Sequence, residues 1–169
     1  RFGEDLMSRV SYGFMNKGGA DELTKSVQDG LQQLIETAAV KRDLDVQDIF
    51  EIVLVGNPVM HHLVLGIDPV ELGGAPFALT FDTAFNCAAH EIGLSLNVAT
   101  RVYVLPCIAG HVGADAAGAV LAEAPHNSEA MTLLIDVGTN AEIMLGNRHH
   151  LMAASSPTGP AFEGAQISA

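Results

Sequence analysis

Apolar residues return along the chain with two different periods, and these periods separate expected helices from expected strands. The clearest helical stripe lies between Asp21 and Arg42, where apolar positions recur every three or four residues. It consists of Leu23, Val27, Leu31, Leu34, Ile35, Ala38 and Ala39. Acidic residues at its start and basic residues at its end suit the dipole of one helix, and glycines separate it from a shorter helix expected within residues 1–15.

Short apolar runs bounded by turn residues predict strands, and the first three runs are expected to be buried. These three runs are 51–55, 101–105 and 131–135. Two further strands, at 141–145 and 150–154, are expected to be joined by a hairpin at Gly146-Asn147. Strands that alternate with helices predict an α/β fold.

Helix signals fill the gaps between these runs. Asn57 can cap a helix and Pro58 fits its first turn. The remaining expected helices cover 59–65, 84–96 and 114–124. Residues 124–130 have the composition of a linker between two lobes.

Composition and charge narrow the functional classes. Of the 169 residues, 49% are hydrophobic and 17% charged, which is enough apolar material for a folded core. The net charge of −12 makes nucleic acid and anionic membrane surfaces poor partners, whereas backbone amides can still bind the phosphates of ATP. No apolar run reaches the roughly 18–20 residues of a membrane span. Two cysteines without CxxC spacing favour reduced thiols in a cytoplasm.

Residues 133–143 carry the strongest chemical signal. An apolar strand delivers Asp136 to its end, and Gly138, Thr139 and Asn140 then turn the chain into a second strand. Glycine in such a turn allows close approach, and successive amides can point at phosphate oxygens. The acid could hold Mg²⁺ through water or orient an attacking water. The alternative is an ordinary β-turn capped by an acid.

Two further segments are candidates for the same site. A Gly-, Pro- and Ser-rich loop at 155–164 carries Ser156, Thr158 and Gly159 just before an expected helix, where hydroxyls suit an anion, and Glu163 is a candidate acid for Mg²⁺ or water. A plain surface loop explains the same composition. The small-residue helix at 114–124 suits close packing at a hinge, and its Asp115 is either a helix N-terminal charge or an acid beside a metal.

The order of strand, acid, Gly-Thr turn, strand, Gly-rich loop and helix resembles the actin, sugar-kinase and heat-shock-chaperone ATPase superfamily. The resemblance implies two ribonuclease-H-like lobes that close on ATP. Part of the first lobe, with the connecting helix, is expected at 1–124, and the start of the second at 125–169. Four stretches are similar to the reductive activators of corrinoid proteins: RFGEDLMSR at 1–9, VGNPVMHHL at 55–63, IDVGTNAE at 135–142 and GPAFEGA at 159–165.

Such activators spend ATP in one domain and take electrons from a [2Fe–2S] domain to reduce a Co(II) corrinoid to Co(I) for methyltransferases. The resemblance therefore implies ATP and Mg²⁺ as ligands, and a corrinoid protein of a methyltransferase system as the partner. The sequence does not decide the oligomeric state, and a homodimer is one possibility. Asp136 is expected to be catalytic. The expected nucleotide contacts are Gly138, Thr139, Asn140, Ser156, Thr158, Gly159 and Glu163.

Two rival functions remain open at this point. One is a small-molecule kinase of the same superfamily, and the other is a docking module that binds a corrinoid protein without catalysis. The chain is expected to be an internal fragment, because a first phosphate loop, an adenosine-contacting segment and the iron–sulfur cysteines are all missing from it. Paired histidines at 61–62 and 149–150 are not expected to bind a metal, since adjacent side chains point in different directions. The cysteines are expected to be buried and unreactive.

Overall fold

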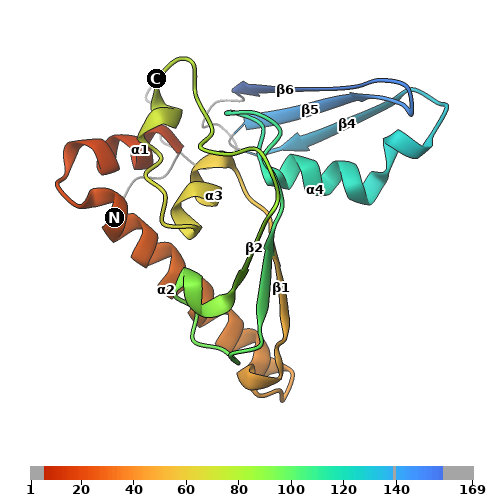
Figure 1. Cartoon of the computed structure of the whole chain (residues 1–169). Helices are drawn as coiled ribbons and strands as arrows, with labels where there is room; N and C mark the ends of the chain where they lie inside the picture. The colour runs from red at the N-terminus through yellow and green to blue at the C-terminus, as the bar shows by residue number, and fades with distance from the viewer. Residues whose placement is uncertain (1–5, 139, 158–169) are drawn as a thin grey trace, which may run out of the picture.

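A computed structural model describes residues 6–138 and 140–157. They form a mixed α/β fold with two separate three-stranded sheets (Figure 1). The α-helices are α1 (Leu6–Met15), α2 (Gly19–Lys41), α3 (Pro58–Val64) and α4 (Ala114–Glu123). The strands are β1 (Glu51–Leu54), β2 (Phe85–Ala88), β3 (Arg101–Val104), β4 (Thr132–Val137), β5 (Asn140–Gly146) and β6 (Leu151–Pro157). Short 3₁₀ segments lie at Val46–Asp48, Val70–Gly73, Ala89–Ile92 and Pro125–Asn127.

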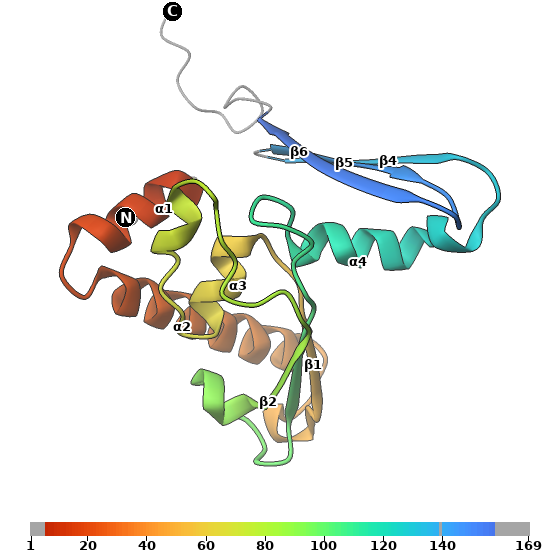
Figure 2. The ribbon, with the colours of Figure 1, turned by 45° about the horizontal axis from the view of Figure 1, so that its top comes forward.

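The first sheet has the strand order β1-β3-β2, with β1 parallel and β2 antiparallel to β3. Its middle strand is the best-buried part, since Val102 and Val104 are 0% and 1% exposed. The apolar stripe of α2 packs against this core through Val27, Leu31 and Ile35. The helical period read from the sequence therefore marks the face that packs on the sheet, and α2 runs obliquely toward the strands, with its C-terminal end nearest them (Figures 1 and 2).

The second sheet is antiparallel throughout, in the order β4-β5-β6. Helix α4 runs beneath it (Figure 2) and buries Ala116 and Val120 against Met144, with Leu134 packed beside them. Small residues on α4 allow this close approach. Within the described part of the chain nothing covers the opposite face, where Leu133, Ile135 and Val137 are between 50% and 61% exposed.

Several expectations from the sequence are confirmed locally. The side chain of Asn57 caps α3, because its Oδ1 accepts the amide of Met60 at 2.9 Å, and Pro58 occupies the first turn. The helix expected at 114–124 is α4, and the hairpin after Gly146 joins β5 to β6. Within the described ranges, no helix combines the length and hydropathy that a bilayer crossing requires.

Three expectations are wrong. Residues 84–96 do not form a helix, because Phe85–Ala88 pair with β3 and a 3₁₀ segment follows. β1 and β4 are half exposed instead of buried, since β1 is an edge strand and β4 has cover on one face alone among the described residues. β6 extends to Pro157, so Ser155 and Ser156 are strand residues and not loop residues. The helix expected at 162–167 lies outside the described residues.

Candidate functional site

The turn between β4 and β5 is a tight hairpin end with an acid on its first strand. Asp136 pairs with Glu142 across the two strands, and Val137 pairs with Ala141. The amide of Gly138 donates to the carbonyl of Asn140 at 2.8 Å, which closes the turn. The Gly138 amide is therefore already used within the hairpin. An anion at the turn would have to be bound by other groups of the loop. Thr139 lies outside the described residues.

Glycine at position 138 is not required by the described structure itself. A Cβ built there would meet the Asn140 carbonyl oxygen at 3.8 Å, which is ordinary contact. Positive φ among the glycines of the described chain occurs at Gly18, Gly66 and Gly93, and not at Gly138. Neither crowding nor backbone conformation therefore calls for glycine at this position.

Polar side chains form one row across the second sheet. Asp136 on β4 pairs with Glu142 on β5, and Glu142 pairs with Ser155 on β6. Directly opposed residues of antiparallel strands share a face, so the three side chains lie on the face that α4 covers. The Ser155 hydroxyl donates to Glu142 Oε1 at 3.2 Å. The sheet thus carries a carboxylate beside Asp136 that is already held in place.

Glu142 differs from Asp136 in its surroundings. Asp136 is exposed, whereas Glu142 is half-buried. Burial raises the pKa of Glu142, the nearby charges of Asp115 and Asp136 raise it further, and the hydrogen bond from Ser155 lowers it. The Glu142 carboxyl consequently holds a proton more firmly than an exposed carboxyl does.

The start of α4 reaches this row from below. The carbonyl of Gly56 at the end of β1 accepts the amides of Ala114 at 2.9 Å and Asp115 at 3.4 Å. A Cβ on Gly113 would lie 2.6 Å from that carbonyl oxygen, so glycine is required there by packing. Asp115 lies in the first turn of α4 and does not cap it, because the cap position is Gly113. The end of the first sheet and the hairpin of the second therefore meet at this helix terminus.

The predicted contact residues divide between two faces of the sheet. Asp136 lies on the α4 side, and Ser156 pairs with Ala141 on the opposite face. Thr158, Gly159 and Glu163 lie outside the described residues. Sequence reasoning missed Glu142 and Ser155. Side chains alternate between the two faces of a strand, so Glu142 and Ser155 can be placed on the face of Asp136 only when the strand register is known.

His61 and His62 have different environments although they are adjacent and both buried. His62 Nδ1 donates to the Pro58 carbonyl at 2.8 Å, and its Nε2 accepts the amide of Thr80 at 3.2 Å. Neither ring nitrogen of His61 makes a well-formed hydrogen bond among the described residues, although a backbone contact with Leu105 opposes the lowering of its pKa. The His61 ring packs with its centroid 5.2 Å from that of Phe81. Burial lowers the pKa of both imidazoles. In the part of the chain that is described, no cluster of His, Cys, Asp or Glu could hold a metal ion.

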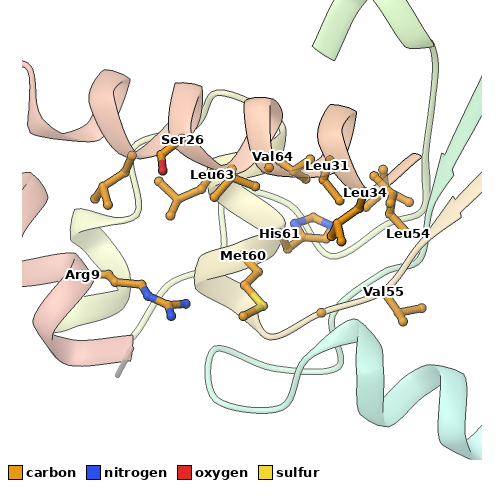
Figure 3. Close-up of a pocket in the computed structure, with 15 residues that line it drawn as sticks. Arg9, Ser26, Leu31, Leu34, Leu54, Val55, Met60, His61, Leu63 and Val64 are labelled. Atoms are coloured by element: carbon orange, nitrogen blue, oxygen red, sulfur yellow. The ribbon is translucent and has the colours of Figure 1, made fainter. Parts of the chain in front are cut away.

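His61 borders a cavity of about 440 Å³ between α2, α3 and the end of β1 (Figure 3). Its walls are mainly aliphatic, and Arg9 and Ser26 are further polar side chains in the lining. The residues of the β4–β5 hairpin do not line it. Cys87 and Cys107 are buried free thiols, and burial raises the pKa of Cys107 to about 11, so neither is set up as a nucleophile.

Known proteins match the chain along its whole length. Residues 1–128 match the family described as the RACo middle region, and residues 130–169 match the C-terminal domain of RACo, described as the ASKHA domain. The corrinoid activation enzyme RamQ of Eubacterium limosum is 35% identical over 166 residues, covering 98% of this chain and 28% of RamQ. A solved structure of a reductive activator for a corrinoid,iron-sulfur protein gives a TM-score of 0.91 at 35% identity, over 99% of this chain and 27% of that one. The chain thus spans little more than a quarter of these relatives.

Proposed function

The chain belongs to the RACo family, and from this premise we propose that it is part of an ATP-dependent reductive activator of corrinoid proteins. In this proposal ATP use drives reduction of a Co(II) corrinoid to Co(I). The 169 residues contribute one side of the nucleotide cleft and the helix that links two lobes, with the division between the lobes near residues 124–125. The actin-type fold of the matched C-terminal domain is what supports a nucleotide as the ligand.

One observation carries the assignment of the site. The β4–β5 hairpin places Asp136 in the last two residues of β4, two positions before a glycine whose presence the fold itself does not require. Phosphate groups need backbone at close range and an acid nearby to organise the accompanying cation and water. Asp136 is assigned that second role, and Gly138, Thr139 and Asn140 are assigned to β- or γ-phosphate. Thr158, Gly159 and Glu163 are assigned to the same cleft. Ser156 was expected there from the sequence, but it lies on the opposite face of the sheet from Asp136, so the proposal does not depend on it.

Mg²⁺ would arrive with ATP and not reside in the protein. This fits the described residues, which lack a cluster able to hold a metal alone. Mg²⁺ at nucleotide sites keeps several waters and takes most of its other ligands from phosphate. Asp136 is accordingly proposed to act through water and not by direct coordination. The buried thiols of Cys87 and Cys107 do not suit an iron–sulfur cluster, so a [2Fe–2S] cluster belongs to another domain of the activator.

The proposed partner is a corrinoid protein of a methyltransferase system, since both named relatives act in corrinoid activation. The proposed location is the cytoplasm, in keeping with free cysteines. The net charge of −12 disfavours nucleic acid and anionic membranes as partners. A homodimer is a proposed assembly that gel filtration of the full-length protein can test.

Substitution of Asp136 in the full-length activator tests the proposal. Asp136→Asn preserves shape and removes the charge, so ATP-dependent reduction of the corrinoid is expected to fall about 100-fold or more while the fold is kept. Cobalt reduction is followed by absorbance and the fold by circular dichroism. Wild-type reduction rates in the variant would remove Asp136 from the mechanism.

The 169-residue chain alone provides a second test. Half of a cleft cannot position ATP for reaction, so this chain is expected to hydrolyse no ATP above background. Phosphate release measured on the purified chain would reveal any turnover. Turnover by this chain would contradict the two-sided cleft. Tight binding to a corrinoid protein without nucleotide would favour a docking role instead.

A further inference from the structure

We propose that Glu142 accepts the proton of the water that attacks the γ-phosphate of ATP. This inference rests on the proposed function and adds a residue to that site. It begins from position. Asp136 lies two residues before Gly138, and Glu142 lies two residues after Asn140, directly across the hairpin. Both carboxylates therefore stand at the same distance from the turn and on the same face of the sheet.

One carboxylate oxygen of Glu142 is held by a hydrogen bond from a neighbouring strand. Ser155 donates its hydroxyl to Oε1 at 3.2 Å from the neighbouring strand, so the carboxylate is supported on the side away from Asp136. A proton acceptor has to be within hydrogen-bond reach of the water it deprotonates, and a fixed carboxylate loses less conformational entropy in reaching that geometry. Asp136 is exposed and, among the described side chains, has no such support.

The surroundings suit proton acceptance better at Glu142 than at an exposed acid. The groups that face it are Asp136 from β4, Asp115 from the first turn of α4 and Ser155 from β6. Half-burial and the two carboxylates raise the pKa of Glu142, and a carboxylate with a raised pKa is the stronger base. The position carries the proposal, and this shift agrees with it.

The step balances without any further reactant. The water oxygen forms a bond to the γ-phosphorus, and the bond between that phosphorus and the bridging oxygen breaks. The bridging oxygen keeps the electron pair and leaves on ADP. The proton of the water goes to the Glu142 carboxylate and is released to solvent after inorganic phosphate leaves.

A purely structural role for Glu142 has to be weighed against this. Its bond to Ser155 joins β5 to β6, and a part-buried hydrogen bond stabilises by about 1 kcal/mol. If that were its whole role, Ser155→Ala and Glu142→Gln would have similar and small effects. Glutamine can still accept the Ser155 hydrogen bond, so Glu142→Gln removes basicity and leaves this contact.

The test uses the full-length activator and separates binding from turnover. Glu142→Gln is expected to lower kcat for ATP hydrolysis about 100-fold or more with unchanged affinity for ATP, because a general base contributes that much. Ser155→Ala is expected to lower kcat far less. Glu129→Gln is the matched control, since Glu129 bonds Arg148 and His149 outside the hairpin, and it should behave as wild type.

The outcomes distinguish this inference from the proposed function. Wild-type turnover in Glu142→Gln, or loss of ATP binding in that variant, overturns the assignment of Glu142 as proton acceptor and leaves the ATP site. Failure of the wild-type protein to bind ATP overturns the proposed function. If Glu142→Gln does not fold, Glu142→Asp replaces it. Withdrawing the carboxylate by one methylene should also lower kcat with ATP affinity intact, and unchanged kcat there counts against the proposal.

Discussion

The two sheets of this chain are both three-stranded and rich in apolar residues, and they differ in what covers them. In the first sheet the middle-strand residues Val102 and Val104 are fully buried under α2 and neighbouring segments. In the second sheet Met144 is buried against α4, while its strand neighbour Leu145 is 37% exposed. Burial is therefore set by the element packed on each face and not by the apolar character of the strand. The sheet that carries the candidate site is the less covered of the two.

Two glycines, Gly113 and Gly138, differ in how closely other atoms surround them. Gly113 is required by the fold, because a side chain there would collide with the backbone at Gly56. Gly138 is free of such crowding, since the nearest atom to a built Cβ is the Asn140 carbonyl oxygen at 3.8 Å. The fold therefore explains the glycine at position 113 and does not explain the one at position 138, and the predictions below test this distinction.

The largest loss of unfolding free energy is expected from a substitution in the core beside the first sheet. Leu63 on α3 is 1% exposed and belongs to a buried apolar cluster, so Leu63→Ala should lower the free energy of unfolding by about 2–5 kcal/mol. Ile135→Ala on the open face of β4 should change it by about 0.5 kcal/mol or less. Urea unfolding of the 169-residue chain measures both. Equal losses would mean that the open face of the second sheet is covered, and the comparison would fail.

A smaller loss is expected where the two sheets meet. Gly113→Ala puts a methyl group 2.6 Å from the Gly56 carbonyl oxygen, which should cost about 1–3 kcal/mol of unfolding free energy. Gly30→Ala is the control, because a Cβ at that helical position meets nothing within 4 Å. That control should be neutral or stabilising by up to about 1 kcal/mol. A Gly113→Ala protein as stable as Gly30→Ala would show that the backbone moves aside at no cost.

Acidification should lower the free energy of unfolding through the two buried histidines of α3. Burial lowers the pKa of His61, and so does the adjacent His62, whose own pKa is also lowered by burial. Above the ordinary pKa of about 6.5 both states are neutral and stability is complete, whereas below it the unfolded chain takes up protons first and stability falls. The slope is at most about 1.4 kcal/mol per pH unit for each histidine.

His61→Leu isolates that contribution. Removing one of the two titrating groups should reduce the loss of unfolding free energy between pH 7 and pH 5, and urea midpoints at both values provide the measurement. Carboxylates titrate in both proteins and cancel in the comparison. Identical losses in the wild type and in His61→Leu would mean that His61 does not titrate differently in the two states.

The smallest effect on stability is expected at the hairpin. Gly138→Ala should leave the unfolding free energy within about 0.5 kcal/mol, because the added methyl group has room. In the full-length protein the same change should weaken ATP binding by obstructing close approach to phosphate. Calorimetric titration with ATP tests the second part. A variant that unfolds easily would place Gly138 in the same class as Gly113.

What the sequence predicted correctly was mostly local. The cap at Asn57 depends on a hydrogen bond to Met60 within one turn, so it could be foreseen. The stripe of α2 was visible for the same reason. The segment at 84–96 was misread because Phe85–Ala88 are fixed as a strand by β3, which comes some fifteen residues later. Periodicity in a short apolar segment does not reveal such a partner.

Part of the candidate site could be proposed from the sequence, and part could not. Asp136 and Gly138 stood out because acid, turn and strand are contiguous in sequence. Glu142 and Ser155 were missed because their place beside Asp136 depends on the register of three strands, and that register is set by the geometry of two turns. Ser156 was expected in the cleft from its neighbours in sequence, while the alternation of the strand puts it on the other face from Asp136.

The twin hydrogen bonds at the Gly56 carbonyl have a mechanical consequence. They anchor the first turn of α4 to the backbone just after β1. The side of the same helix packs against β4 and β5. A tilt of one sheet against the other would therefore have to strain or break these two hydrogen bonds at Ala114 and Asp115. Because Asp136, Glu142 and Ser155 lie on the sheet that packs on α4, their position relative to the first sheet depends on these two hydrogen bonds.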